Sequence, residues 1–381
     1  MITDKKILLI APISKSSLAD GYTNAALGML EVLSSMKEKK FIKNIEAINL
    51  AEIQTANVPL TTFDIIILIM NPFFIQNVLQ QTQLQNILKK GKKVFLQIVW
   101  ETQPLPRSWS WIWKSDNFSG FIAPSFFIKK QLETVTNKQV AYIPHFVDIF
   151  KFSRIDYDKK IKEKFFTVLS IGQWTKRKGQ EDAIISFARS SLSASNDCRL
   201  IVKYNSIKEE SVNIDEQIKN LIRANNFKLN SAIFTSNESF SNEDLVELYK
   251  MTSVLLYPSR GEGFGLIPLE YMSIGIPVIY TGWSATAEVA KAPGNIPIKY
   301  ILDEAVGMAQ FGYEIGLKYA LPIISDLMSA LELKYALWCK SKEAYYQETI
   351  NNYKLVDERY GIQAVTNNFI EMFKVVDNEN N

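Results

Sequence analysis

Short apolar runs alternate along the chain with longer segments in which apolar residues recur every three or four positions. The first run, 6-KILLIAPI-13, is followed by a polar loop, 14-SKSSLADG-21, and then by a helical pattern of leucines. Uninterrupted apolar strands are typical of a parallel sheet whose two faces are both covered by helices. Further strands of this kind are predicted at residues 45–50, 64–70, 93–99 and 120–125. The pattern therefore predicts a doubly wound α/β domain over residues 1–150.

The same alternation restarts after a charged segment, residues 148–164, which we interpret as a linker. A second Rossmann-like parallel-sheet domain is predicted over residues 165–340, followed by helices over residues 341–381. Open parallel sheets bind ligands at the carboxyl ends of their strands, so a ligand cleft between the two domains is expected. The strands of the second domain are predicted at residues 165–172, 199–204, 232–235, 253–258 and 277–281.

One strand-to-helix turn of the second domain, 259-SRGEGFGLIPLE-270, carries candidate chemistry. Its glycines allow close approach of a ligand, and the N–H groups at a helix start favour a phosphate. Glu262 is predicted in the loop and Glu270 in the first helical turn, where both can accept hydrogen bonds from the hydroxyls of a sugar or a ribose. Two other interpretations stay open: a tight turn with solvated acids, and a dinucleotide-binding loop, although the spacing GxGxG is not that of the fingerprint.

Composition restricts the class of protein. The 381 residues are 47% hydrophobic and 22% charged with a net charge of +3, which gives no electrostatic argument for binding nucleic acid or an anionic membrane. Cys198 and Cys339 lie far apart and are interpreted as free thiols in a reducing cytosol. We find no targeting segment and no apolar run of the ~20 residues that a membrane helix needs. A cytoplasmic protein is expected, and peripheral membrane contact stays open.

The stretch 259–270, with 275-GIPVI-279 after it, resembles the signature of retaining glycosyltransferases of the GT-B fold, sequence family 4, the group 1 glycosyltransferases. The resemblance implies two Rossmann-like domains facing a central cleft, the first on the acceptor side and the second on the donor side, with C-terminal helices crossing back to the first domain. Four further segments resemble family motifs in the same order: 100-WETQPLPRSW-109, typical of a bacterial and phage-like subset, 143-IPHFVDIFKF-152, 171-IGQWTKRKG-179 and 319-YALPIISDLMSAL-331.

The resemblance implies a nucleotide-diphosphate sugar as donor and a role for each matching residue. Glu270 would bind the ribose hydroxyls, Glu262 would contact the donor sugar, and Lys178 would neutralise the leaving diphosphate. The backbone amides of Phe264, Gly265 and Leu266, next to Gly263, would hold the diphosphate. The other donor-site residues that the resemblance implies are Arg177, Gln173, Gly21, Asn237 and Glu238.

The sequence departs from the family pattern in three places. Gln173 stands where the family has an arginine, and the first loop keeps only Asp20-Gly21 of the usual glycine pair. Glu101 and Thr102 stand near the position of a histidine that the family often places beside the sugar, which makes Glu101 a candidate catalytic residue. The single histidine, His145, has two interpretations, a structural or hinge residue and a cleft-lining one.

Two further features each have a structural and a functional interpretation. Glu288, after 281-TGWSAT-286, matches an acid that the family often has near the sugar or phosphate, and it is otherwise an ordinary helix residue. The alternating Trp109, Trp111 and Trp113 predict a strand or sheet edge that packs its tryptophans; the alternative is a sugar-stacking or membrane-facing patch.

The prediction from the sequence is a metal-independent, retaining glycosyltransferase that needs no cofactor besides its nucleotide-sugar co-substrate. The one D-x-D, Asp156-Tyr157-Asp158, lies in the charged linker and is not interpreted as a metal site. The acceptor stays open among glycan, lipid, protein and modified nucleobase. The alternatives are an NAD-dependent Rossmann oxidoreductase, although the loop after the first strand lacks its glycine fingerprint, and a catalytically degenerate transferase that acts as a partner protein.

Overall fold

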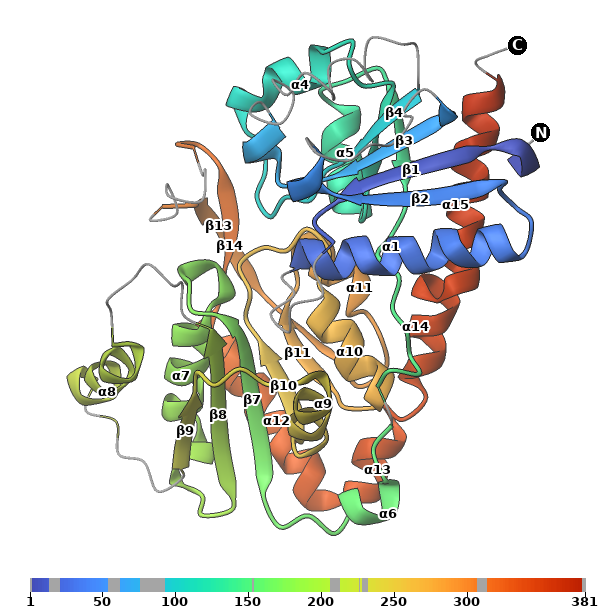
Figure 1. Cartoon of the computed structure of the whole chain (residues 1–381). Coiled ribbons are helices and arrows are strands. Elements are labelled where there is room, and N and C mark those ends of the chain that lie inside the picture. Colours follow the sequence, from blue (N-terminus) through green and yellow to red (C-terminus); the bar gives the residue numbers. More distant parts are fainter. Residues whose placement is uncertain are drawn as a thin grey trace. The chain divides into compact units, whose positions relative to one another are not determined.

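The computed structural model of the chain describes residues 2–13, 21–53, 62–75, 93–152, 154–205, 213–225, 227, 232–306 and 314–378 (Figure 1). The chain forms two compact units, and each is described by itself. The first comprises Met1–Asp148, Gln310–Leu317 and Asp357–Asn381; the second comprises Ile149–Ala309 and Lys318–Val356. Residues 14–20 of the predicted first loop lie outside the described residues.

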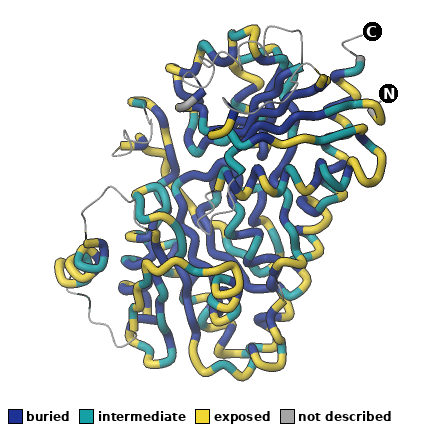
Figure 2. Tube along the Cα trace, viewed as in Figure 1, coloured by how far each residue is buried: buried dark blue, intermediate teal, exposed yellow. Residues whose placement is uncertain are grey.

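The first unit is built on a six-stranded sheet in which every strand pairing is parallel, in the order β2-β1-β3-β4-β5-β6. Strands β1 and β3 at its centre are buried along nearly their whole length, which explains their uninterrupted apolar sequences (Figure 2). The strands are β1 (Lys6–Ala11), β2 (Asn44–Asn49), β3 (Ile65–Ile69), β4 (Lys93–Gln97), β5 (Gly120–Ala123) and β6 (Gln139–Tyr142).

The last helix of the chain completes the core of this first unit. Val365, Phe369 and Phe373 of this helix, α15, are almost fully buried in one apolar cluster with residues of β1 and of the first helix, α1. The C-terminal helix therefore belongs to the first unit rather than to the second. Among the described residues, the helices of the first unit are α1 (Gly21–Glu38), α4 (Ser110–Lys114), α5 (Phe126–Glu133) and α15 (Ile362–Asn378), with short 3-10 helices η1 (Ile2–Asp4), η2 (Leu50–Glu52), η4 (Pro72–Phe74) and η5 (Arg107–Trp109).

The second unit repeats the parallel arrangement. Its six-stranded sheet has the order β12-β11-β10-β7-β8-β9, and all of these pairings are parallel. The prediction of two parallel-sheet α/β domains is therefore confirmed. The strands are β7 (Phe166–Gln173), β8 (Cys198–Asn205), β9 (Ala232–Ser236), β10 (Val254–Tyr257), β11 (Val278–Thr281) and β12 (Ile296–Ile298).

Helices join these strands, and one antiparallel hairpin of β13 (Tyr300–Glu304) and β14 (Lys318–Pro322), which the sequence pattern did not predict, follows β12. Local sequence defines several helix starts: in α9, for example, Ser241 and Asp244 form a reciprocal capping box. The helices are α6 (Tyr157–Lys160), η6 (Lys176–Lys178), α7 (Gln180–Arg189), η7 (Ser191–Ala194), α8 (Ile214–Ala224), α9 (Asn242–Lys250), α10 (Leu266–Ile274), α11 (Ser284–Val289), α12 (Ile324–Lys340), α13 (Lys342–Gln347) and α14 (Asn352–Tyr360), whose end enters the last segment of the first unit.

The tryptophan segment differs from its prediction as a strand. Residues 107–114 form the 3-10 helix η5 and the short helix α4. On a helix, positions four apart lie on one face, so Trp109 and Trp113 are both buried, with ring centroids 6.4 Å apart, while Trp111 between them is half-buried. Trp109 also packs edge-on against Trp100 at 4.7 Å. The prediction of a strand was therefore wrong, because alternate positions include a pair four residues apart, which fits a helical face as well.

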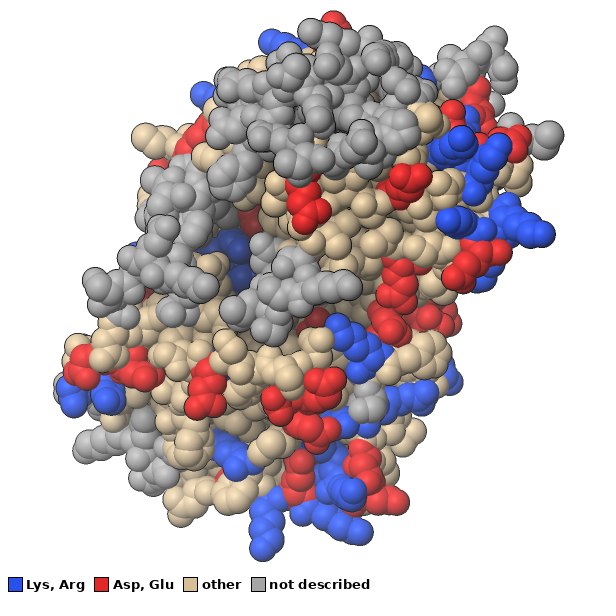
Figure 3. Space-filling view, in the orientation of Figure 1, with Lys and Arg blue, Asp and Glu red and all other residues tan. Residues whose placement is uncertain are grey.

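Basic and acidic side chains are interspersed on the molecular face drawn in Figure 3, as the small net charge leads one to expect. In the linker, Asp156 caps the start of α6 by accepting a hydrogen bond from the backbone N–H of Lys159. None of the helices among the described residues has the length and apolar character that crossing a bilayer requires.

Candidate active site

The turn between β10 and α10 depends on Gly265. This glycine precedes Leu266, the first residue of α10, and has a φ of 108°, a conformation that other residues rarely adopt. A Cβ atom on Gly265 would also lie 3.2 Å from the Cγ2 atom of Val289. An α-helix does not pair the N–H groups of its first turn internally, so a helix start of this kind can bind an anion.

A second turn, between β7 and α7, packs directly against the first. A Cβ atom on Gly179, where φ is 67°, would lie 2.2 Å from the carbonyl oxygen of Pro258. The backbone N–H of Arg260 donates to the carbonyl oxygen of Arg177 at 2.7 Å. Two turns about eighty residues apart in sequence are thus joined through their backbones at the carboxyl edge of one sheet.

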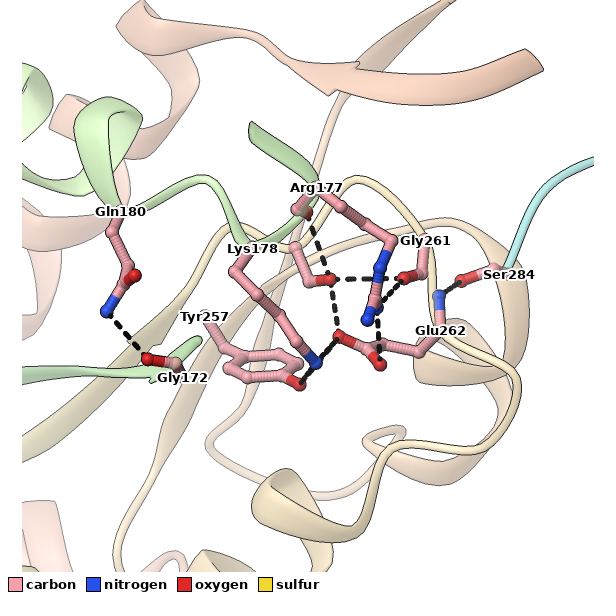
Figure 4. A network of polar contacts seen from close by, with 9 residues as sticks. Gly172, Arg177, Lys178, Gln180, Tyr257, Gly261, Glu262 and Ser284 are labelled. Carbon is pink, nitrogen blue, oxygen red and sulfur yellow. Dashed lines mark hydrogen bonds and ion pairs between the residues drawn. The ribbon is translucent and has the colours of Figure 1, made fainter. Parts of the chain in front are cut away.

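Glu262 is the centre of the polar contacts between the two turns (Figure 4). Its side chain is buried, and the residue is 7% exposed. Its Oε1 atom accepts hydrogen bonds from Lys178 Nζ at 2.7 Å, Tyr257 Oη at 2.7 Å and Ser259 Oγ at 2.6 Å. Its Oε2 atom accepts from Arg177 Nη1 at 3.1 Å. The carboxylate therefore carries one negative charge between two cations.

These contacts control the ionisation of Glu262. Burial by itself would raise the pKa of this carboxyl, but the charges of Lys178 and Arg177 and the hydrogen bonds from Lys178 and Ser259 lower it to about 2. Glu262 is therefore ionised at neutral pH although it is buried. In turn, the buried Tyr257 hydroxyl beside it has a pKa raised well above its ordinary value, by burial and by the charge of Glu262.

Glu270 lies in the second turn of α10 rather than in its first, because the helix begins at Leu266, two residues before the predicted start. It is half-buried, and its Oε2 atom accepts a hydrogen bond from Tyr249 Oη at 2.9 Å. Burial raises the pKa of the Glu270 carboxyl, while the hydrogen bond from Tyr249 and the charge of Lys151 oppose that rise. The two acids of the turn thus differ: Glu262 is paired with cations, and Glu270 with a neutral tyrosine.

The structure brings Arg177, Lys178 and Glu262 together. Gln173 is the exposed last residue of β7, and Asn237 and Glu238 are exposed just after β9. The backbone of the turn itself is largely covered, since Gly263, Phe264 and Gly265 are buried and Leu266 is half-buried.

Four candidate residues that the sequence indicated belong to the first unit. Gly21 is the first residue of α1 and Glu101 is half-buried after β4. Thr102 is buried, and its carbonyl oxygen accepts a hydrogen bond from Gln131 Nε2 at 3.3 Å. His145 is buried beside apolar side chains that include Met29 and Phe369, and burial lowers the pKa of its imidazole to about 4.

Four polar partners of the two acids were not identified from the sequence. Tyr257 and Ser259 hold Glu262 from the end of β10, Ser284 Oγ accepts a hydrogen bond from the Glu262 backbone N–H at 3.0 Å, and Tyr249 holds Glu270. Ser284 begins α11, in which the candidate Glu288 is half-buried. A tyrosine in a buried strand or helix is usually a core residue, so the sequence pattern alone carried no signal for Tyr249 or Tyr257.

Comparison with known proteins shows which family this part of the chain resembles. Residues 152–296, which include both turns, match the family model "Glycosyl transferases group 1". A candidate glycosyltransferase of Acidianus filamentous virus 2, ORF330, is 27% identical over 198 residues, which are 52% of this chain and 54% of that protein. The aligned part thus spans about half the length of this curated relative.

Many solved structures resemble this chain, and two of them match nearly its whole length. The Anabaena protein HepE, solved in complex with UDP and glucose, has a TM-score of 0.63 and 13% identity, and the match covers 97% of this chain and 100% of that one. Sucrose-phosphate synthase from Thermosynechococcus elongatus has a TM-score of 0.68 and 15% identity, with 98% and 100% covered. At such low identity these likenesses show the fold alone. The chain therefore has the GT-B fold, and residues 152–296 within it are similar to the group 1 glycosyltransferases.

Proposed function

We propose that the chain is a retaining glycosyltransferase of sequence family 4, which moves a sugar from a nucleotide diphosphate to an acceptor hydroxyl. The observation that carries this proposal is the joining of the two turns through Glu262, which binds Lys178 and Arg177 four residues before the start of α10. Two cations and a helix start are the features that bind a diphosphate. That the Anabaena structure holds UDP and glucose supports the same donor class here.

In this proposal the second unit binds the donor by its diphosphate and its ribose. The amides of Phe264, Gly265 and Leu266 donate to the diphosphate at the helix start, and Lys178 and Arg177 supply positive charge. Glu270 accepts hydrogen bonds from the ribose hydroxyls. Gln173, Asn237 and Glu238 are the candidates for contacts with the rest of the nucleotide.

The chemical step breaks the bond between the anomeric carbon and the diphosphate oxygen, and the electron pair leaves with that oxygen. The acceptor hydroxyl forms the new bond on the same face of the sugar and passes its proton to the departing diphosphate oxygen, so that the products are the glycoside and the nucleoside diphosphate. Negative charge that develops on the leaving diphosphate is stabilised by fixed donors and cations already in place, which is commonly the largest catalytic contribution. Lys178, Arg177 and the helix start provide the positive charge that a metal ion would otherwise supply. We therefore propose that the reaction requires no divalent metal.

Glu262 has two roles in the proposed reaction. It holds Lys178 and Arg177 at the edge of the turn, and its Oε2 atom, which takes one hydrogen bond against three on Oε1, retains capacity for a sugar hydroxyl. Glu101 is the candidate of the first unit for a contact with the reacting sugar. The acceptor is a hydroxyl-bearing glycan, lipid, protein or modified nucleobase.

The test is donor turnover by the purified chain. UDP-, GDP-, ADP- and dTDP-sugars are incubated with the protein, with and without cell extract, and release of the nucleoside diphosphate and formation of products are followed by mass spectrometry. We expect turnover of one donor class in the presence of a metal chelator, and its loss in Glu262→Ala. Failure to consume any of these donors, with extract present, would contradict the proposal and would favour a catalytically degenerate chain.

A further inference from the structure

Tyr249 is buried in the second unit at the point where α9 meets α10. It is the penultimate residue of α9 and is 1% exposed. Its ring lies against that of Tyr271, with centroids 4.4 Å apart, so its position is defined by packing. Its hydroxyl group donates to Glu270 Oε2 at 2.9 Å. A hydroxyl that is fixed by a packed ring presents its hydrogen bond in one direction.

The two oxygens of Glu270 have different environments. Oε2 takes the hydrogen bond from Tyr249, whereas Oε1 takes no hydrogen bond from any residue in the part of the chain that the structure describes. The side chain is half-buried, so a ligand can reach it. One oxygen is thus fixed by the protein and the other is left to accept hydrogen bonds from outside.

The charged and titratable groups around Glu270 come from four elements. Tyr249 on α9, Tyr257 on β10 and Tyr271 on α10 are neutral phenols, and Lys151 in the segment before α6 is the single cation that acts on Glu270 among the described residues. Burial raises the pKa of Glu270, and the hydrogen bond from Tyr249 is the largest effect that opposes it. Loss of that hydrogen bond would therefore raise the pKa further.

We propose that Tyr249 is a positioning residue for nucleotide binding, which holds Oε2 of Glu270 so that Oε1 accepts hydrogen bonds from the ribose of the donor. This inference rests on the proposed function, because it takes the ribose to be the ligand of Glu270. Tyr249 itself does not touch the nucleotide. It acts through the orientation and the ionisation of one carboxylate.

The test compares two tyrosines that lose the same kind of buried hydrogen bond. Tyr249→Phe removes the hydrogen bond to Glu270. Tyr345→Phe is the control: Tyr345 is 3% exposed, and its hydroxyl donates a hydrogen bond to the carbonyl oxygen of Ser253 at 3.0 Å. Binding of UDP, GDP, ADP and dTDP to both variants and to the unchanged chain is measured by calorimetry between pH 5 and pH 8. Thermal unfolding confirms that each variant is folded.

We expect Tyr249→Phe to weaken binding of the preferred nucleotide about five- to tenfold at pH 7.5, because a hydrogen bond to a charged acceptor is lost. Ribose binding needs the ionised carboxylate, so affinity falls as the pH drops through the pKa of Glu270. In Tyr249→Phe this fall should begin at a higher pH, whereas Tyr345→Phe should follow the unchanged chain. The terminal phosphate of the ligand titrates alike in all three proteins, so the difference between the curves reports Glu270.

A double-mutant cycle keeps the test decisive if Tyr249→Phe also lowers stability. In the Glu270→Gln variant the carboxylate charge is absent. Adding Tyr249→Phe to that variant should therefore change the affinity for the nucleoside diphosphate less than twofold. If Glu270→Gln weakens binding and Tyr249→Phe behaves like Tyr345→Phe, the inference is wrong and the proposed function stands. If the unchanged chain binds none of the four nucleotides, both are wrong.

Discussion

Glu262 and Lys178 form a buried ion pair, with 2.7 Å between Oε1 and Nζ, that joins the two turns of the second unit. Arg177 makes a second ion pair with the same carboxylate at 3.1 Å. The two cations proposed to bind the diphosphate are thus held by one of the two acids of the turn. Glu262 should therefore have two effects that variants can measure separately. It should compete with the diphosphate for the two cations, and it should support turnover of the donor sugar.

Replacement of Glu262 by glutamine should affect binding and turnover in opposite directions. Glu262→Gln removes the negative charge that competes with a diphosphate for Lys178 and Arg177, so calorimetry should show nucleoside diphosphate bound a few-fold more tightly. Turnover of the donor sugar should fall about a hundredfold or more, because contacts to the developing charge are commonly worth that much. Glu216→Gln, at an exposed pair on α8, is the matched control and should change neither. Weaker diphosphate binding with normal turnover would contradict this account of Glu262.

The pKa of Glu262 predicts a specific dependence of stability on pH. Its pKa in the folded chain is about 2, below the ~4.3 of an unfolded glutamate, so the ionised group stabilises the fold above that unfolded value. This contribution, on the order of 3 kcal/mol, should be lost as the pH falls through about 2. Urea unfolding of the unchanged chain and of Glu262→Gln from pH 5 to pH 2.5 should give free energies of unfolding that converge. A constant difference between them would mean that Glu262 is not paired as the structure has it.

Asp182 should be needed for the shape of the Glu262 turn. Its Oδ2 atom accepts hydrogen bonds from Arg260 Nη2 at 2.8 Å and Nε at 3.2 Å, and both side chains are about seven-eighths buried. Asp182→Asn leaves the Arg260 guanidinium buried without its counter-charge, which should lower the free energy of unfolding by about 3 kcal/mol. Because Arg260 belongs to the turn, nucleotide binding should weaken as well. Urea unfolding and calorimetry measure the two effects, and unchanged values for both would show that this ion pair is dispensable.

Gly179 should tolerate no side chain, unlike a glycine elsewhere in the fold. In Gly179→Ala the new methyl group would clash with the carbonyl oxygen of Pro258, and the alanine would have a strained backbone conformation, so the two turns must separate. We expect the free energy of unfolding to fall by about 2–4 kcal/mol and donor turnover to be lost. Gly28→Ala is the matched control. It lies inside α1, where the methyl group finds only ordinary contacts, and it should stabilise the chain by ~0.5–1 kcal/mol. Normal turnover in Gly179→Ala would show that the turns need not touch.

The parallel sheets were predictable from the sequence because burial on both faces leaves a direct pattern, the continuous apolar run, as in β1 and β3. The start of α10 was predicted within two residues from Pro268 and the glycines before it. The tryptophans of residues 107–114 were assigned wrongly, since alternate positions also include a pair four apart, and packing decided between strand and helix.

The candidate site was only partly predictable. The sequence located Glu262, Lys178 and Arg177 but not their ion pairs, because the contacts join turns that lie about eighty residues apart. The direction of the Glu262 side chain depends on that tertiary contact and has no local pattern. Tyr249 and Tyr257 were missed because each acts through a single hydroxyl group on a ring that otherwise belongs to the core.

The most direct test of the account is a calorimetric titration of the chain and of Glu270→Ala with UDP, GDP, ADP and dTDP at pH 7.5. The account predicts that one nucleoside diphosphate binds the unchanged chain without added metal, and that Glu270→Ala binds it at least tenfold more weakly. The absence of binding by all four, or equal binding by the unchanged chain and Glu270→Ala, would contradict the assignment of this turn to a nucleotide sugar.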